Sequence, residues 1–139
     1  MSVEIDIAYT GDLRCTATHV RSGNTLTTDA PLDNGGRGEA FSPTDLVATG
    51  VGACMMTVMG LVAQRHGIDL TGAKVRVIKE MIAAPVRRIG AIRVTITFPP
   101  GRSFSPEDRE RLERAAHICP AKHSLHPDVN AVVDFVYGE

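Results

Sequence analysis

The longest uncharged stretch of the chain, Leu46–Val62, constrains the fold more than any other feature. It has 17 residues, which is at the short end for a membrane-spanning helix, and it contains three glycines. We therefore interpret it as a helix buried in a protein core. Ser42-Pro43-Thr44-Asp45 supplies a start signal and Gly67 a stop signal.

This helix is apolar on every side, so the sequence predicts that it is buried all round. A small chain has too little sheet to cover such a helix alone. A second copy of the same chain can cover the rest. We therefore expect an obligate, symmetric homodimer with these helices at its centre.

Alternating apolar and polar residues predict short strands on both sides of the helix. A charged helix is expected from Ser105-Pro106 to about His117, and a short helical turn after Cys119-Pro120. The element order is then βββ-α-ββ-αα-β, an α+β pattern without a β-α-β unit, in a single domain over residues 1–139. The predicted strands are Val3–Tyr9, Leu13–Thr18, Thr25–Asp29, Lys74–Ile82, Ile89–Phe98 and Val129–Tyr137.

Charge and composition exclude several classes of partner. The 139 residues include 15 Lys and Arg against 16 Asp and Glu, which gives a net charge of −1. That balance argues against electrostatic binding to nucleic acid or to an anionic membrane. Only 4% of residues are aromatic and none is Trp, which argues against stacking on bases.

The start of the sequence has neither a basic region nor an apolar region of the kind found in signal peptides. The cysteine count is three, and an odd number indicates reduced thiols rather than structural disulfides. We expect a cytoplasmic protein.

Cys54 lies in the middle of the predicted central helix and allows two interpretations. A free Cys in apolar surroundings usually packs as a small hydrophobic residue. A reactive thiol there needs a nearby cation, which Arg14, Arg21 or Arg37 could supply.

Cys119 precedes Pro120, so it is predicted to cap a helical turn, where backbone amides stabilise a thiolate. A structural cap and a functional thiol both fit this position. Cys15 faces Leu13 and Ala17 in a strand, and we expect it in the core.

His117, Cys119, His123 and His126 are close in sequence but straddle a helix break. A metal site needs three or four ligands that converge on one point, and no spaced Cys or His pair typical of such sites is present. We predict no metal and no other cofactor. The Gly-rich segment around Arg37 lacks the Lys and Ser/Thr of a phosphate-binding loop, which favours a flexible connection.

Two segments together resemble the OsmC/Ohr family. The first runs from Leu26-Thr27-Thr28-Asp29-Ala30-Pro31 through Gly35–Leu46 to Gly52-Ala53-Cys54-Met55, and the second is Ala116-His117-Ile118-Cys119-Pro120 with Ser124-Leu125. The resemblance covers essentially the whole chain. It implies an intertwined homodimer with two three-stranded antiparallel sheets per chain around a buried central helix.

The resemblance also implies an activity. Characterised members are thiol peroxidases for organic hydroperoxides that serve in oxidative or osmotic stress defence. By position, Cys54 is the peroxidatic cysteine and Cys119 the resolving cysteine. A disulfide forms between them and a dithiol, of the lipoyl type for example, reduces it.

Two supporting positions differ from the peroxidase branch, which carries an Arg in the first hairpin loop and a Glu early in the central helix. Here Thr44-Asp45 stands early in the central helix in place of the Glu. Arg14 and Arg37 are the nearest candidates for the Arg of the hairpin loop. We expect one of these arginines to approach Cys54 and Asp45 to orient it. In this respect the chain resembles the OsmC-like branch more than the organic hydroperoxide resistance branch.

Two other functions stay open on the sequence. One is a non-enzymatic, redox-sensing dimer that binds a small apolar ligand. A weaker one is a metal-binding protein that uses the histidines around Cys119. Consumption of peroxide in the presence of a dithiol distinguishes the enzyme from both.

Overall fold

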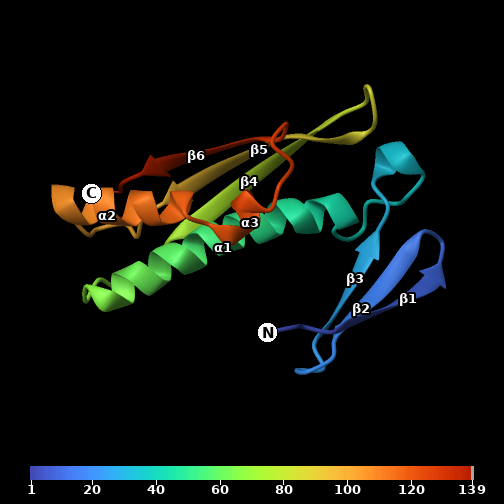
Figure 1. Ribbon diagram of the computed structural model, residues 1–139, viewed down its shortest axis with the longest axis horizontal. Coiled ribbons are helices and arrows are strands. Elements are labelled where there is room, and N and C mark those ends of the chain that lie inside the picture. The colour runs from blue at the N-terminus through green and yellow to red at the C-terminus, as the bar shows by residue number, and fades with distance from the viewer. Residues whose placement is uncertain (139) are drawn as a thin grey trace. The chain divides into compact units, whose positions relative to one another are not determined.

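The computed structural model describes residues 1–138, which form two compact units that divide between Val47 and Ala48. The first unit contains an antiparallel sheet with the strand order β1-β2-β3 (Figure 1). Its strands are β1 (Ile5–Gly11), β2 (Arg14–His19) and β3 (Thr25–Asp29), followed by the short helix η1 (Leu32–Asn34). The predicted meander at the start of the chain is confirmed.

The apolar residues of β1 are exposed, although the alternation predicts a half-buried strand. Ile7 and Tyr9 each retain 67% of their surface. The reason is that the sheet forms a single layer within its unit, so neither face has a packing partner there. Cys15 is accordingly only half-buried on β2, and its predicted place in the core is wrong for this chain.

The central helix α1 (Pro43–Arg65) begins at the predicted capping box. The Ser42 hydroxyl accepts a hydrogen bond from the Asp45 amide at 3.1 Å, and the Asp45 carboxylate accepts one from the Ser42 amide at 2.9 Å. Asp thus does the work that Glu or Gln usually does at this position. The helix ends just before Gly67, whose positive φ of 65° lets the chain turn away.

The second unit holds a second three-stranded sheet, in the order β4-β5-β6, with helices on one of its faces (Figure 1). The expected α+β architecture with two three-stranded sheets is confirmed. The elements are β4 (Lys74–Ile82), β5 (Arg88–Thr97), α2 (Pro106–His117), α3 (Pro120–His123) and β6 (Asn130–Val136).

One detail of the predicted topology is wrong. β6 pairs with β5 in parallel, so this sheet is mixed rather than antiparallel. The helices α2 and α3 lie between the two strands in sequence and carry the chain back to the end of the sheet where β5 began. The segment β5-α2-α3-β6 is therefore a β-α-β crossover, which the element order alone did not predict.

The core of the second unit lies between this sheet and the helices α1 and α2. The most deeply buried apolar side chains there include Val51, Met55, Met59, Ile92, Val94, Ile96, Phe98 and Leu112. α1 is long and apolar enough to cross a membrane by length and composition, with a mean hydropathy of 2.0. One side of α1, which carries Val51, Met55 and Met59, packs in the core of this unit.

In the single chain, α1 is buried on one side only, and the expectation of burial all round is not met. Gly50, Ala53, Thr57 and Leu61 are exposed on the opposite side, and we call them the exposed α1 stripe. Leu61 retains 50% of its surface. No atom lies within 4 Å of the position that a Cβ would occupy at Gly50. This side is apolar and made mostly of small residues.

The buried side of α1 approaches β4 closely at Gly52. A Cβ added there would lie 2.5 Å from Cγ2 of Val77 and 3.3 Å from Cγ1 of Val75. Only glycine allows this distance between helix and strand, because any side chain would overlap the two valines. The contact fixes the part of α1 that carries Val51 and Cys54.

We predict that Gly52→Ala lowers the free energy of unfolding by about 1–3 kcal/mol, the usual range for overpacking a core. Urea denaturation measures this. In a Val77→Ala background the same substitution has room for its methyl group, so its effect is expected to shrink by at least half. An equal loss in both backgrounds would show that the Val77 contact is not the cause.

Candidate active site

Cys119 occupies the turn between α2 and α3. It is the N-cap residue of α3, and its Sγ accepts a hydrogen bond from the Lys122 amide at 3.4 Å. Pro120 follows at the first helical position, where a missing amide proton is harmless. The capping role predicted for Cys119 is confirmed.

The Cys119 side chain is fully buried, and its second hydrogen bond reaches α1. Its Sγ donates to the carbonyl oxygen of Val51 at 3.8 Å. Val51 is the residue before Gly52, so the same stretch of α1 packs on β4 and accepts the hydrogen bond from the Cys119 thiol. This bond ties the crossover to the central helix.

The Cys54 thiol lies beside that of Cys119. Burial raises the pKa of the Cys119 thiol, the Lys122 amide works against the increase, and the neighbouring Cys54 thiol adds to it. Cys54 itself is half-buried. The two cysteines are 65 residues apart in sequence, and the fold of the second unit brings them together.

This arrangement suits thiol–disulfide chemistry. Cys119 is held in its neutral, protonated form and is shielded from solvent, whereas Cys54 keeps part of its surface. Adjacent thiols of this kind can give up two electrons together and form a disulfide.

The supporting residues expected from the sequence belong to the Met1–Val47 unit. Arg14 forms an ion pair with Glu39 at 3.3 Å, Arg37 is exposed in the glycine-rich segment, and Asp45 is part of the capping box. Their contribution to the reactivity of Cys54 therefore stays a prediction.

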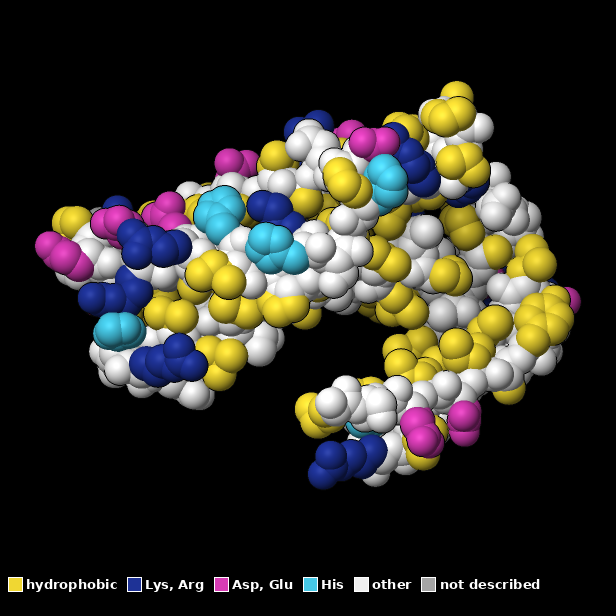
Figure 2. All heavy atoms as spheres, in the orientation of Figure 1, with side chains coloured by type: hydrophobic (Ala, Val, Ile, Leu, Met, Phe, Trp, Pro, Cys, Tyr) yellow, Lys and Arg dark blue, Asp and Glu magenta, His cyan; other side chains and the backbone are white. Residues whose placement is uncertain are grey.

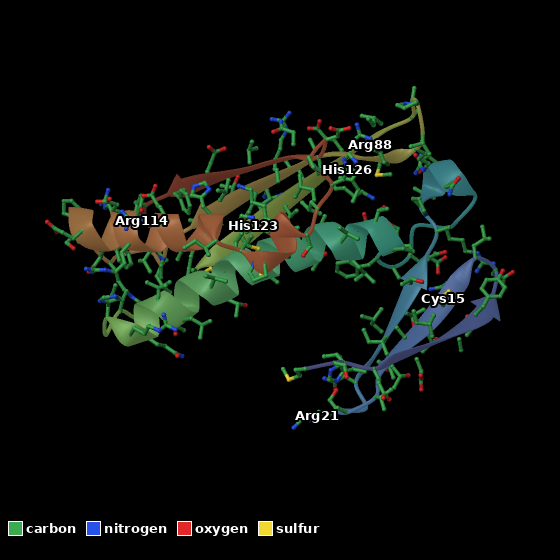
Figure 3. The ribbon with its side chains drawn as sticks, viewed as in Figure 1. Cys15, Arg21, Arg88, Arg114, His123 and His126 are labelled. Carbon is green, nitrogen blue, oxygen red and sulfur yellow. The ribbon has the colours of Figure 1, made fainter. Side chains whose placement is uncertain are left out.

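Several Lys, Arg and His side chains lie on the surface near α2 and α3, with acidic side chains among them over α2 (Figure 2). Figure 3 labels His123 on α3 and His126 near Arg88. Arg88 donates to the carbonyl oxygen of Asp128 at 3.5 Å. Within residues 1–138, no three His, Cys, Asp or Glu side chains are placed so that they could hold a metal ion.

Comparison with known proteins places the chain in a family. The family described as OsmC-like protein matches residues 36–134, which include Cys54 and Cys119. The chain belongs to the OsmC-like protein family. No curated protein matches it.

Solved structures of the family share the fold. A candidate osmotic stress induced and detoxification response protein from Psychrobacter arcticus is 40% identical, with a TM-score of 0.88 over 94% of this chain and 93% of that one. OhrB of Bacillus subtilis, an organic hydroperoxide resistance protein, is 16% identical, with a TM-score of 0.68 over 97% and 98% of the two chains.

A third similar structure is that of an organic hydroperoxide resistance protein OsmC from Legionella pneumophila. It is 17% identical, with a TM-score of 0.76 over 98% of this chain and 97% of that one. At this identity the likeness concerns the fold.

Sequence analysis missed the two backbone groups that bond to Cys119. The Val51 carbonyl and the Lys122 amide have no signature in residue type. The capping position of Cys119 gave a signal for Lys122, since an N-cap side chain bonds to the amide two or three residues later. No sequence signal pointed to the Val51 carbonyl, because its bond to Cys119 depends on the packing of the crossover against α1.

We predict that iodoacetamide alkylates Cys54 faster than Cys119 in the folded, reduced protein. Cys119 is buried and its raised pKa keeps it protonated, whereas the reagent needs an accessible thiolate. Mass spectrometry of tryptic peptides in a Cys15→Ser background measures both rates. Faster labelling of Cys119 would contradict this view of the site.

The same assay tests the arginines. If Arg14 or Arg37 assists Cys54, replacing it with Ala slows alkylation of Cys54 by about tenfold, the loss of one charge-assisted contact. Arg21→Ala is the matched control. Unchanged rates in both Arg14→Ala and Arg37→Ala would rule out the assignment.

Proposed function

We propose that this protein reduces organic hydroperoxides with Cys54 as the peroxidatic and Cys119 as the resolving cysteine. The observation that carries the proposal is the contact between these two thiols, made by segments far apart in sequence. Family membership supports it, because both cysteines fall within the region that matches the family.

The reaction has two chemical steps. The Cys54 thiolate attacks the outer oxygen of the hydroperoxide, the O–O bond breaks, an alcohol leaves and Cys54 becomes a sulfenic acid. The Cys119 thiol then attacks the Cys54 sulfur, water leaves and a disulfide forms. Two electrons have passed from the thiol pair to the peroxide.

The difference between the two thiols supports these roles. A peroxidatic thiol must meet the substrate, and Cys54 is the one with exposed surface. A resolving thiol needs only to reach the sulfenic acid, and Cys119 is buried next to Cys54. Held as a neutral thiol, Cys119 does not compete for the peroxide.

Several structural relatives carry names that agree with this chemistry. Those from Elizabethkingia anophelis, Vibrio cholerae and Bacillus subtilis are described as organic hydroperoxide resistance proteins, the one from Vibrio cholerae as a candidate. The relative at 40% identity is described as a candidate for detoxification response. These names support a role in peroxide defence for this chain.

A complete cycle needs a reductant and an activating group. A cellular dithiol, for example one of the lipoyl type, reduces the disulfide, and the cytoplasm supplies such thiols. Arg14 or Arg37 stabilises the Cys54 thiolate and Asp45 helps to orient that arginine. A non-enzymatic role as a redox sensor or ligand-binding dimer remains the alternative outcome of the tests below.

We also propose that the active protein is a homodimer joined through the exposed α1 stripe. The stripe is apolar, and Gly50 and Ala53 let a second helix approach closely. Covering it would complete the burial that the sequence of α1 predicts. The apolar side chains exposed on β1 offer further surface for the same assembly.

We predict that one equivalent of cumene hydroperoxide converts the reduced protein to a Cys54–Cys119 disulfide, and that turnover follows when dihydrolipoamide is supplied. Cys54→Ser abolishes consumption of peroxide, because the attacking thiolate is lost. Cys119→Ser reacts once and leaves a sulfenic acid at Cys54, which a dimedone probe detects by mass spectrometry. A ferrous-iron assay follows the peroxide.

Cys15→Ser is the matched control and is expected to change nothing, because the proposed mechanism gives the Cys15 thiol on β2 no role. Full activity in Cys54→Ser, or a disulfide that contains Cys15, would refute the mechanism and favour the ligand-binding alternative.

For the homodimer, we predict that Leu61→Glu yields monomers in sedimentation velocity at low micromolar concentration. An unpaired carboxylate buried in an apolar interface costs several kcal/mol. Ile78→Glu on β4 is the control, because Ile78 and Leu61 each retain 50% of their surface in the single chain. A wild-type protein that is monomeric, or a Leu61→Glu variant that stays dimeric, would contradict the interface.

A further inference from the structure

The Cys54–Cys119 disulfide of the proposed cycle has two sulfurs, and a reductant can attack either one. The choice decides which cysteine carries the covalent intermediate with the reductant and which leaves as a thiolate. In thiol–disulfide exchange it depends on which sulfur can be reached and on which thiolate is the better leaving group. The structure bears on both.

Access favours Cys54. Cys119 has no exposed surface in the single chain. Cys54 is half-buried, and the proposed function requires an approach to its sulfur for the hydroperoxide. A thiol that follows the same approach meets the Cys54 sulfur first.

Burial raises the pKa of the Cys119 thiol and so weakens it as a leaving group, but backbone hydrogen bonds at its sulfur offset part of that effect. The Lys122 amide already points at Sγ at 3.4 Å, and it would bond more strongly to a thiolate than to a neutral sulfur. A backbone hydrogen bond from Ala121 also acts on this thiol and favours its charged form. These amides lie in a turn that packs on the core through Ala121 and Leu125, so they are in place before the bond breaks.

We infer that reductants attack the Cys54 sulfur of the disulfide and that Cys119 departs as a thiolate held by the Lys122 amide. This rests on the proposed function and specifies its reductive half. The reductant thiolate forms a new S–S bond to Cys54 as the Cys54–Cys119 bond breaks, and the electron pair stays on Cys119, which then takes a proton from water. A second reductant thiol attacks the reductant sulfur of this mixed disulfide and releases Cys54 as a thiolate.

Cys119 is then a leaving group in one half of the cycle and a nucleophile in the other. The Lys122 amide is a positioning group in both halves of the cycle, because it holds the Cys119 sulfur at the N-terminus of α3. The partner for this site is a thiol that reaches a half-buried sulfur, and it needs no contact with Cys119.

The experiment maps the mixed disulfide. The Cys15→Ser protein is oxidised with diamide, which makes the disulfide without any peroxide, and is mixed briefly with glutathione. Acid stops the exchange, the remaining thiols are alkylated, and peptide mass spectrometry locates the glutathione. The expected result is glutathione on Cys54 and the alkyl group on Cys119. Glutathione found mainly on Cys119 would overturn the inference.

A pair of variants tests the amide. Lys122→Pro removes the N–H that bonds to Sγ, whereas Lys122→Ala keeps it and removes only the charged side chain. Reduction of the disulfide by glutathione is expected to slow about tenfold in Lys122→Pro relative to Lys122→Ala, the loss of one hydrogen bond to a charged group. Equal rates in the two variants would show that the Lys122 amide has no role in the reduction. Circular dichroism checks that both variants are folded.

The proposed function and the inference about its reductive half can each be refuted separately. If peroxide does not produce the Cys54–Cys119 disulfide, the proposed function is wrong, whatever the mapping of the diamide-oxidised protein shows. If peroxide produces it but glutathione is found on Cys119, the enzyme stands and only the direction of reduction is wrong.

Discussion

The second unit depends on the close contact between α1 and β4 at Gly52. It sets how deeply the helix lies on the sheet, and so where the Val51 carbonyl and the Cys54 side chain stand. A bulkier residue at position 52 would lift the helix from Val77 and move both groups relative to the turn that carries Cys119. The same glycine that allows dense packing therefore also sets the spacing of the two thiols.

Much of the fold follows from local signals in the sequence. The capping box at Ser42 and Asp45, the glycine stop at Gly67 and the N-cap at Cys119 each concern a few neighbouring residues, and each is present as predicted. The direction of β6 is different, because it depends on how a crossover of two helices returns to the sheet. The exposure of β1 likewise depends on whether a second layer packs on its sheet. The alternation of apolar and polar residues along one strand does not show this.

In the candidate site, too, only some features could be predicted from the sequence. Residue types and the family resemblance identified Cys54 and Cys119, but nothing in a separation of 65 residues indicates that their sulfurs meet. The Val51 carbonyl could not be predicted for the same reason, since every residue carries a carbonyl, whereas the N-cap position of Cys119 pointed to an amide such as that of Lys122. Chemistry that uses side chains leaves a trace in sequence, whereas chemistry that uses the backbone leaves one only in the fold.

The parallel pairing of β5 and β6 has a consequence for the newly made chain. Cys119 reaches Cys54 only when the crossover has closed, which makes this contact a late, non-local event in folding. In an unfolded chain the loop between Cys15 and Cys54 is shorter than the one between Cys54 and Cys119, and shorter loops close at a smaller entropic cost. Oxidation before folding would thus favour the pair that the native structure does not use. A chain that folds with its three thiols reduced avoids this competing disulfide.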